Sequence, residues 1–149
     1  MGTVARYLDV NVPAKTAYAW WRWLTNLPSI LPDVESVQPI DASTELTHCK
    51  VHGPLGTTVE WDAKIVEDVR GEKIAWASTG GQVANARAVR FDDHGNSTGV
   101  EVTLSYDPPA GVFGDAVAKL FADPQAKVEK ALGAFKATIE SGTRAGVQP

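Results

Sequence analysis

The sequence predicts an α+β protein in which a curved antiparallel sheet of six or seven strands surrounds a long C-terminal helix. Residues 34–107 alternate apolar and polar side chains between short turn signals, which is the pattern of strands with one buried face. Residues 124–141 carry a single apolar stripe at helical spacing. The connections between the strands are too short for parallel crossovers, so neighbouring strands are predicted to be antiparallel.

The N-terminal segment predicts a strand followed by short helices. Val4, Leu8 and Val10 form one apolar face, which Arg6 interrupts at what we expect to be the exposed start of the strand. Pro13 is expected in the first turn of a helix, where its missing N–H costs nothing. The helical stripe that follows consists of Ala14, Ala17, Tyr18, Trp21 and Leu24, widened by Trp20 and Trp23.

Two of the central strands are especially clear. One alternates Val59, Trp61, Ala63 and Ile65 with Glu60, Asp62, Lys64 and Val66. The other alternates Val100, Val102, Leu104 and Tyr106 with Glu101, Thr103, Ser105 and Asp107. One apolar and one polar face per strand predict a sheet that is covered on one side only.

The C-terminal helix is predicted to cover that side. Asp123 is the expected N-cap, Pro124 the first-turn residue and Gly142 the C-cap. The apolar stripe consists of Val128, Leu132, Phe135 and Ile139. A twisted sheet that curls around such a helix leaves a space where the two surfaces diverge, and a ligand would bind there.

The chain is expected to form one ligand-binding domain over residues 1–142, with a disordered tail over 143–149. A short amphipathic helix is expected over residues 113–121. No basic cluster that could neutralise nucleic-acid phosphates is visible in a chain of net charge −4. No apolar run approaches a membrane span, so no stable membrane insertion is expected. A single cysteine and an N-terminus unlike a signal peptide predict a cytoplasmic protein, either monomer or homodimer.

Several segments together resemble a known family. They are the strand, Pro13 and helix with Tyr18 and Trp21; Asn26-Leu27-Pro28; Glu60-Trp61-Asp62-Ala63; Ile74-Ala75-Trp76; Asn85 before Val89 and Phe91; Tyr106-Asp107-Pro108-Pro109; and Phe135-Lys136 to Ile139-Glu140. In order and spacing they resemble the polyketide cyclase/dehydrase branch of the START-like (SRPBCC, helix-grip, Bet v 1-like) superfamily. The resemblance covers nearly the whole chain.

This resemblance implies a helix-grip fold with a cavity for a hydrophobic or aromatic molecule. Its members include aromatic polyketide cyclases, quinone or lipid carriers and partner-binding proteins, so it does not imply one activity. Arg87 stands where family members often have glycine, and Cys49 stands where many have tryptophan. Both differences would alter the cavity.

Other motifs have simpler interpretations. His48, Cys49 and His52 are metal-ligand types, but on a strand positions four apart lie about 13 Å from each other, so no metal site is predicted. Residues 92–96 mimic part of a calcium loop and are better explained as an Asx-Gly hairpin turn. Glu60 and Asp62 share one strand face and could form an acid/base pair, although a solvated outer face is favoured. No cofactor is predicted.

Polar residues in an apolar register give the sharper signal. Asn85 and Arg87 share a face with Val89 and Phe91, and a buried polar group without a partner costs roughly 2–7 kcal/mol. Either a ligand or a structural partner could satisfy them. The predicted cavity-lining residues are Trp61, Trp76, Ser78, Asn85, Arg87, Val102, Leu104, Tyr106, Leu132 and Phe135.

Three functions remain open from the sequence. The first is binding of a small hydrophobic ligand: a lipid, an isoprenoid or quinone, or a polycyclic aromatic. The second is an aromatic polyketide cyclase or dehydrase, in which Arg87 would stabilise an enolate and Asn85 or Tyr106 would assist proton transfer. The third is a protein-interaction domain that uses the exposed sheet face or the Trp20–Trp23 segment.

Overall fold

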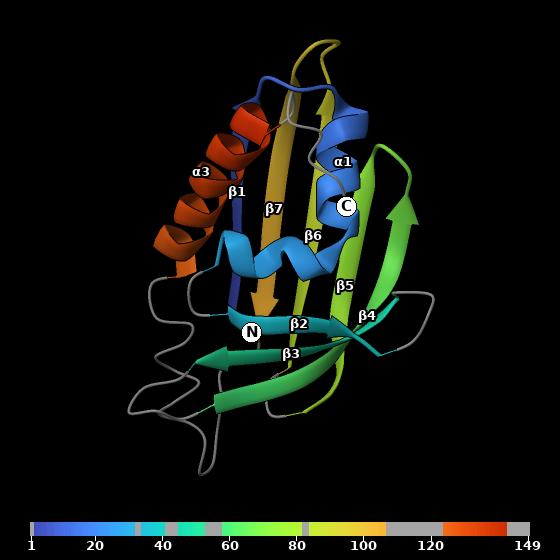
Figure 1. The fold of residues 1–149 in the computed structure, drawn as a ribbon, viewed down its shortest axis with the longest axis vertical. Coiled ribbons are helices and arrows are strands. Elements are labelled where there is room, and N and C mark those ends of the chain that lie inside the picture. Colours follow the sequence, from blue (N-terminus) through green and yellow to red (C-terminus); the bar gives the residue numbers. More distant parts are fainter. Residues whose placement is uncertain are drawn as a thin grey trace.

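Seven strands form one antiparallel sheet in the computed structural model, which describes residues 2–31, 34–40, 45–52, 58–81, 84–106 and 124–142 (Figure 1). The strands are β1 (Gly2–Val10), β2 (Val34–Pro39), β3 (Leu46–His52), β4 (Thr58–Val69), β5 (Lys73–Gly81), β6 (Asn85–Asp93) and β7 (Thr98–Tyr106). The helical segments are α1 (Ala14–Arg22), the 3₁₀ helix η1 (Leu24–Ser29) and α3 (Pro124–Gly142). The predicted helix over residues 113–121 and the predicted tail over 143–149 lie outside the described residues.

Strands β2 to β7 form an antiparallel meander, and β1 adds to its edge beside β7. The sheet order is β1-β7-β6-β5-β4-β3-β2, so each strand from β2 to β7 pairs with the next, and β1 pairs with β7. Gly71 and Gly95 have positive φ values of 78° and 90° at the predicted turns before β5 and after β6. Glycine adopts this backbone conformation without steric cost. The predicted α+β fold with a curved antiparallel sheet and a long C-terminal helix is therefore confirmed.

Strand β4 bends along its length (Figure 1). This strand has 12 residues, and its pairing with β5 shifts register between Asp62 and Ala63 and again between Ile65 and Glu67. Such irregularities bend a strand and increase its twist. As a result, β2, β3 and the first half of β4 run across the end of the other four strands (Figure 1).

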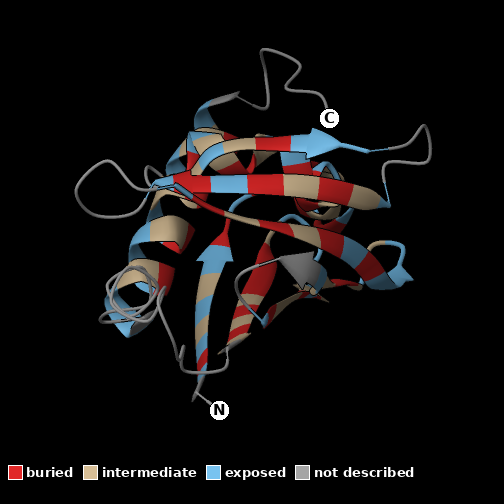
Figure 2. Cartoon of the chain, turned by 90° about the horizontal axis from the view of Figure 1, so that it is seen from below, coloured by how far each residue is buried: buried red, intermediate tan, exposed pale blue. Residues whose placement is uncertain are grey.

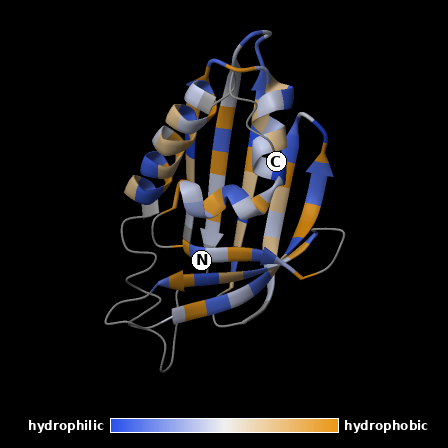
Figure 3. Ribbon diagram, viewed as in Figure 1, coloured by the Kyte–Doolittle hydropathy of each residue, from blue (hydrophilic) through white to orange (hydrophobic). Residues whose placement is uncertain are grey.

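The helices lie on the inner face of this curved sheet. α3 contacts β1 and β7, α1 contacts β5 and β6, and η1 contacts β2. Buried and exposed residues alternate along the strands (Figure 2), and hydrophobic and hydrophilic residues follow the same bands (Figure 3). The inward set includes the four residues of the predicted helical stripe, Val128, Leu132, Phe135 and Ile139.

Three local predictions need correction. Pro13 precedes α1 instead of lying in its first turn, and its carbonyl accepts from the N–H groups of Thr16 and Ala17. Trp23 follows the helix and is 39% exposed, so it does not widen the buried stripe. Arg6 lies in the middle of β1, where its Nε donates to Glu129 of α3 at 3.0 Å. A long side chain on the apolar face can reach past the helix edge to solvent.

α3 is tied to β1 by polar contacts along its length. Besides Arg6–Glu129, Lys136 Nζ donates to the carbonyl oxygen of Asp9 at 3.1 Å. The backbone N–H of Asn11 donates to Glu140 Oε2 at 2.8 Å.

No helix among the described residues is both long and apolar enough to cross a membrane.

Candidate functional site

The candidate site is the inner face of the sheet beneath α3 and α1. Most of the predicted cavity-lining side chains are buried on this face: Trp61, Trp76, Asn85, Val102, Leu104, Leu132 and Phe135. They come from strands β4 to β7 and from α3. Alternation along each strand directs them inward, because successive side chains point to opposite faces.

Four aromatic rings connect α1, α3 and β5. The Phe135 ring lies 5.0 Å from that of Trp20 and 5.2 Å from that of Trp21, measured between centroids. Trp21 also lies 6.4 Å from Trp76. Trp20 and Trp21 are 3% and 4% exposed. The sequence left open whether the clustered tryptophans form a core or a cavity lining; two of them form part of the core against which Phe135 and Trp76 pack.

In the described part of the chain, two buried side-chain polar atoms on the inner side have no hydrogen-bond partner. They are Trp21 Nε1 and Thr47 Oγ1. Buried polar atoms are nearly always hydrogen-bonded in folded proteins, because leaving one unpaired costs about 1–3 kcal/mol. An acceptor brought by a bound molecule would satisfy either atom.

Asn85 begins β6 and lies beside Ser78 of β5 and opposite Tyr106 of β7. Ser78 Oγ accepts a hydrogen bond from the backbone N–H of Asn85 at 3.0 Å. Asn85 is buried, Ser78 is half-buried, and the sheet register pairs Asn85 with Tyr106. The tyrosine side chain lies outside what the structure describes.

Arg87 occupies the centre of the inner face. β6 is flanked by β5 and β7, and Arg87 pairs with Trp76 on one side and Leu104 on the other. Its side chain is half-buried, although Asn85 and Val89 on the same face are buried. Desolvation by burial lowers the pKa of the guanidinium, and Cys49 opposes this shift.

Cys49 belongs to the same inner environment. It is 5% exposed on β3, opposite Trp61 of β4. Burial raises the pKa of its thiol, while the Arg87 guanidinium and the Thr47 hydroxyl oppose the rise. β3 and β6 are separated in the sheet by β4 and β5. Their side chains therefore interact only because the sheet curves.

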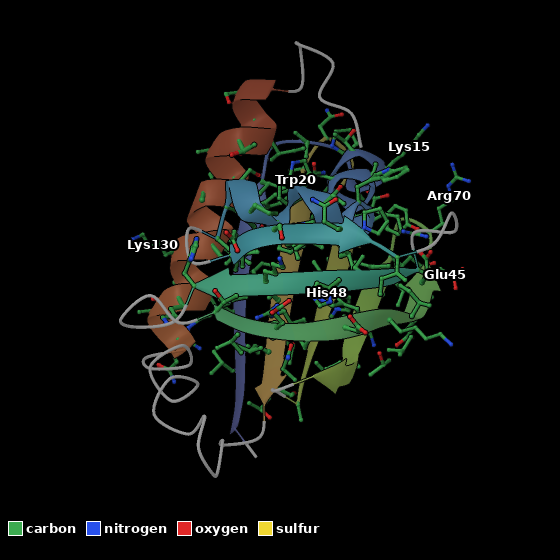
Figure 4. The ribbon with its side chains drawn as sticks, turned by 60° about the horizontal axis from the view of Figure 1, so that its bottom comes forward. Lys15, Trp20, Glu45, His48, Arg70 and Lys130 are labelled. Carbon is green, nitrogen blue, oxygen red and sulfur yellow. The ribbon has the colours of Figure 1, made fainter. Side chains whose placement is uncertain are left out.

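A separate charged cluster lies on the outer face. His48 Nδ1 is 2.6 Å from Asp62 Oδ1, and His48 Nε2 is 2.7 Å from Glu60 Oε1. A carboxylate only accepts hydrogen bonds, so the imidazolium form, in which both nitrogens donate, satisfies both contacts. Hydrogen bonds to Asp62 and to Glu60 accordingly raise the pKa of His48. Figure 4 shows His48 on β3.

The contacts with His48 show where the Glu60 and Asp62 carboxylates lie. Both side chains are 45% exposed and alternate with buried residues of β4. The expected outer-face location is confirmed, and the two carboxylates hold His48 instead of facing the interior. The sequence showed both carboxylates but not the histidine between them, which depends on the pairing of His48 with Asp62 across β3 and β4. The described residues include no group of three His, Cys, Asp or Glu side chains suited to a metal ion.

The chain matches the family model for "Polyketide cyclase / dehydrase and lipid transport" over residues 10–132. The protein belongs to this family. It is 32% identical over 112 residues to an uncharacterized 17.2 kDa protein of the melC2-rnhH intergenic region of Streptomyces lincolnensis, covering 72% of this chain and 71% of that protein.

Two solved structures agree with this family membership. The Zhui aromatase/cyclase from Streptomyces sp. R1128 matches with a TM-score of 0.76 at 18% identity, over 99% of both chains. A START superfamily protein from Mycobacterium smegmatis matches with a TM-score of 0.72 at 16% identity, over 93% of this chain and 97% of that one. At these identities the likeness establishes the START-like helix-grip fold of this polyketide cyclase/dehydrase family member.

Sequence reasoning missed two groups of the inner face. Trp21 and Thr47 were not among the predicted site residues, and the Trp21 Nε1 and Thr47 Oγ1 atoms are buried without a hydrogen-bond partner in the described ranges. Thr47 could have been found from the sequence, because it shares strand parity with Cys49 and Val51. The Trp21 indole N–H could not have been found from the sequence, because its surroundings depend on how α1 packs.

Proposed function

We propose that this family member binds a small hydrophobic molecule between the inner face of the sheet and α3. The ligand class is a lipid, an isoprenoid or quinone, or a polycyclic aromatic. The observation that carries the proposal is an apolar, aromatic inner face that includes two buried polar atoms, Trp21 Nε1 and Thr47 Oγ1, without a hydrogen-bond partner among the described residues. Ligand sites in proteins have this composition: mostly apolar walls with a few placed polar groups.

Burial of apolar ligand surface would supply most of the affinity, at about 25 cal/mol per Å² before the costs of association are subtracted. The predicted lining residues would provide the apolar walls, with Ser78, Asn85, Arg87 and Tyr106 as orienting groups. The buried free thiol of Cys49 agrees with a reducing compartment, and we propose the cytoplasm as the location.

Native mass spectrometry of protein purified from its own host tests this proposal. A co-purifying lipid, quinone or polycyclic aromatic is the expected result. Protein that carries no ligand, and that shows no thermal shift across a library of such compounds, would contradict it.

An aromatic polyketide cyclase or dehydrase is the second candidate, and one observation favours it. Asn85 of β6 pairs with Tyr106 of β7, and Arg87 lies two positions after Asn85 on β6. A guanidinium and two hydrogen-bonding groups near one reacting carbon could stabilise an enolate and move a proton. Turnover of an aromatic-forming polyketide analogue, lost in Arg87→Met, would establish this activity.

The interaction-domain alternative is weakened. One of its two expected docking surfaces, the Trp20–Trp23 segment, is largely inside the protein, because Trp20 and Trp21 are buried; the exposed sheet face is the other. The segment therefore offers Trp23 alone as an exposed tryptophan.

A further inference from the structure

The guanidinium of Arg87 differs from the other described strand and helix arginines, because it has no counter-ion among the residues that the structure describes. Arg6, Arg22 and Arg90 lie 3.0, 3.1 and 3.3 Å from the carboxylates of Glu129, Asp68 and Glu101. No hydrogen bond or ion pair joins Arg87 to any residue in the described ranges.

The position of Arg87 makes this absence of a counter-ion unusual. The residue lies on a central strand, between a buried tryptophan and a buried leucine, and faces inward with Asn85 and Val89. A cation taken out of water needs a partner, because the low-dielectric surroundings do not replace its hydration. Within the described ranges, the ionisable group that interacts with it is the Cys49 thiol, and burial favours the neutral form of that thiol.

The half-buried state of Arg87 adds a second point. Its neighbours on the same face, Asn85 and Val89, are buried, yet the arginine keeps accessible surface. At the same time it is desolvated enough for burial to lower its pKa. A side chain enclosed by protein but still reachable by a small molecule has this combination of properties.

We propose that Arg87 binds the carboxylate of an amphipathic acid whose apolar part packs against Trp76, Leu104 and the rest of the inner face. This inference rests on the proposed function and specifies its ligand. A carboxylate fits because the guanidinium presents parallel N–H donors that match two oxygens. Cys49, whose thiol interacts electrostatically with the Arg87 guanidinium, would lie near the same end of the ligand.

The test compares acids with their uncharged esters. Isothermal titration calorimetry is run near neutral pH on delipidated protein with dodecanoate and methyl dodecanoate, and with 2-naphthoate and methyl 2-naphthoate. The two pairs distinguish an alkyl from an aromatic acid. We expect at least one acid to bind about 10- to 100-fold more tightly than its ester, the range that hydrogen bonds to a charged group provide.

Substitutions test whether Arg87 causes the preference for the acid over the ester. Arg87→Met should bring the acid and the ester to similar affinity, and Arg87→Lys should retain part of the difference. Arg90→Met is the matched control, because Arg90 lies on the outer face of the same strand and pairs with Glu101; it should keep the full preference. If Arg87→Met fails to fold, Arg87→Gln replaces it.

The outcomes separate the two proposals. Equal binding of acid and ester by the wild type, or an acid preference that survives in Arg87→Met, overturns the carboxylate site and leaves hydrophobic binding standing. Binding of neither acid nor ester, together with an empty protein in native mass spectrometry, removes both.

Discussion

On the outer face of β3, His48 lies between two carboxylates of β4. Because Asp62 and Glu60 hold the protonated ring, the folded-state pKa of His48 lies above its ordinary value of 6.5. A group whose pKa is raised by folding stabilises the protein fully below its unfolded pKa. That contribution is lost as the pH rises through the folded-state pKa.

His48→Gln should therefore lower the free energy of unfolding at acidic pH and leave it nearly unchanged at alkaline pH. The loss should be about 0.2–1 kcal/mol, because the three side chains are 39–45% exposed and solvent screens them. Urea unfolding between about pH 5 and pH 9 measures it. His52→Gln, at the exposed end of the same strand, is the control. A difference that grows with pH would contradict this account.

Strand parity alone predicted which face Asn85 and Arg87 share, because the side-chain period of a strand is two. It could not predict that Arg87 and Cys49 interact. That electrostatic interaction joins strands separated by two others and depends on sheet curvature, which no local pattern encodes.

At the scale of elements, the boundaries and the buried stripe of α3 were predictable. Val128, Leu132, Phe135 and Ile139 recur at helical spacing, and all are buried. The partner of Arg6 was not predictable. Glu129 is 123 residues away in sequence, so the contact depends on how α3 packs against β1.

Phe135→Ala should destabilise the protein by about 3–5 kcal/mol, the usual loss for a fully buried aromatic side chain. Phe135 is 0% exposed and contacts both Trp20 and Trp21, so the substitution leaves a cavity between α3 and α1. Guanidinium unfolding followed by tryptophan fluorescence measures the loss.

Lys130→Ala on the exposed side of the same helix is the matched control (Figure 4). It should change stability by less than about 0.5 kcal/mol. Equal effects of the two substitutions would mean that Phe135 does not anchor the helix.

α1 is fixed to the sheet by Asp68. This carboxylate accepts from the Tyr18 hydroxyl and lies 3.1 Å from Arg22 Nε. Burial and the hydrogen bond to Asp68 raise the pKa of Tyr18 to about 12.

Asp68→Ala should cost about 1–2 kcal/mol, since it removes both contacts and leaves the half-buried tyrosine hydroxyl unpaired. Glu67→Ala removes the neighbouring surface ion pair with Lys73 at 3.0 Å and should cost less than about 0.5 kcal/mol. Thermal unfolding compares the two. In a double-mutant cycle, Tyr18→Phe should add little to Asp68→Ala; full additivity would show that the pair is not coupled.

At the scale of the whole molecule, the sequence predicts six or seven strands, their antiparallel pairing and the covering helix. The first register shift between β4 and β5 skips Thr79, which precedes Gly80, a residue type that commonly marks a bulge. The sequence does not predict the second shift, which skips Val66, because no glycine or proline lies there. Such shifts bend a strand, and β2 and β3 run across the end of the other strands (Figure 1). The shape of the inner face is therefore a tertiary property.

The central claim is that a hydrophobic ligand binds at this inner face, and the five tryptophans allow a direct measurement. In a ¹⁵N-labelled sample each indole N–H gives one signal, assigned by single Trp→Phe substitutions. Addition of a compound found by native mass spectrometry or calorimetry should shift the signals of Trp21, Trp61 and Trp76, which are buried, and leave exposed Trp23 unchanged. Saturating binding that shifts Trp23 alone, or none of the five, would contradict the claim.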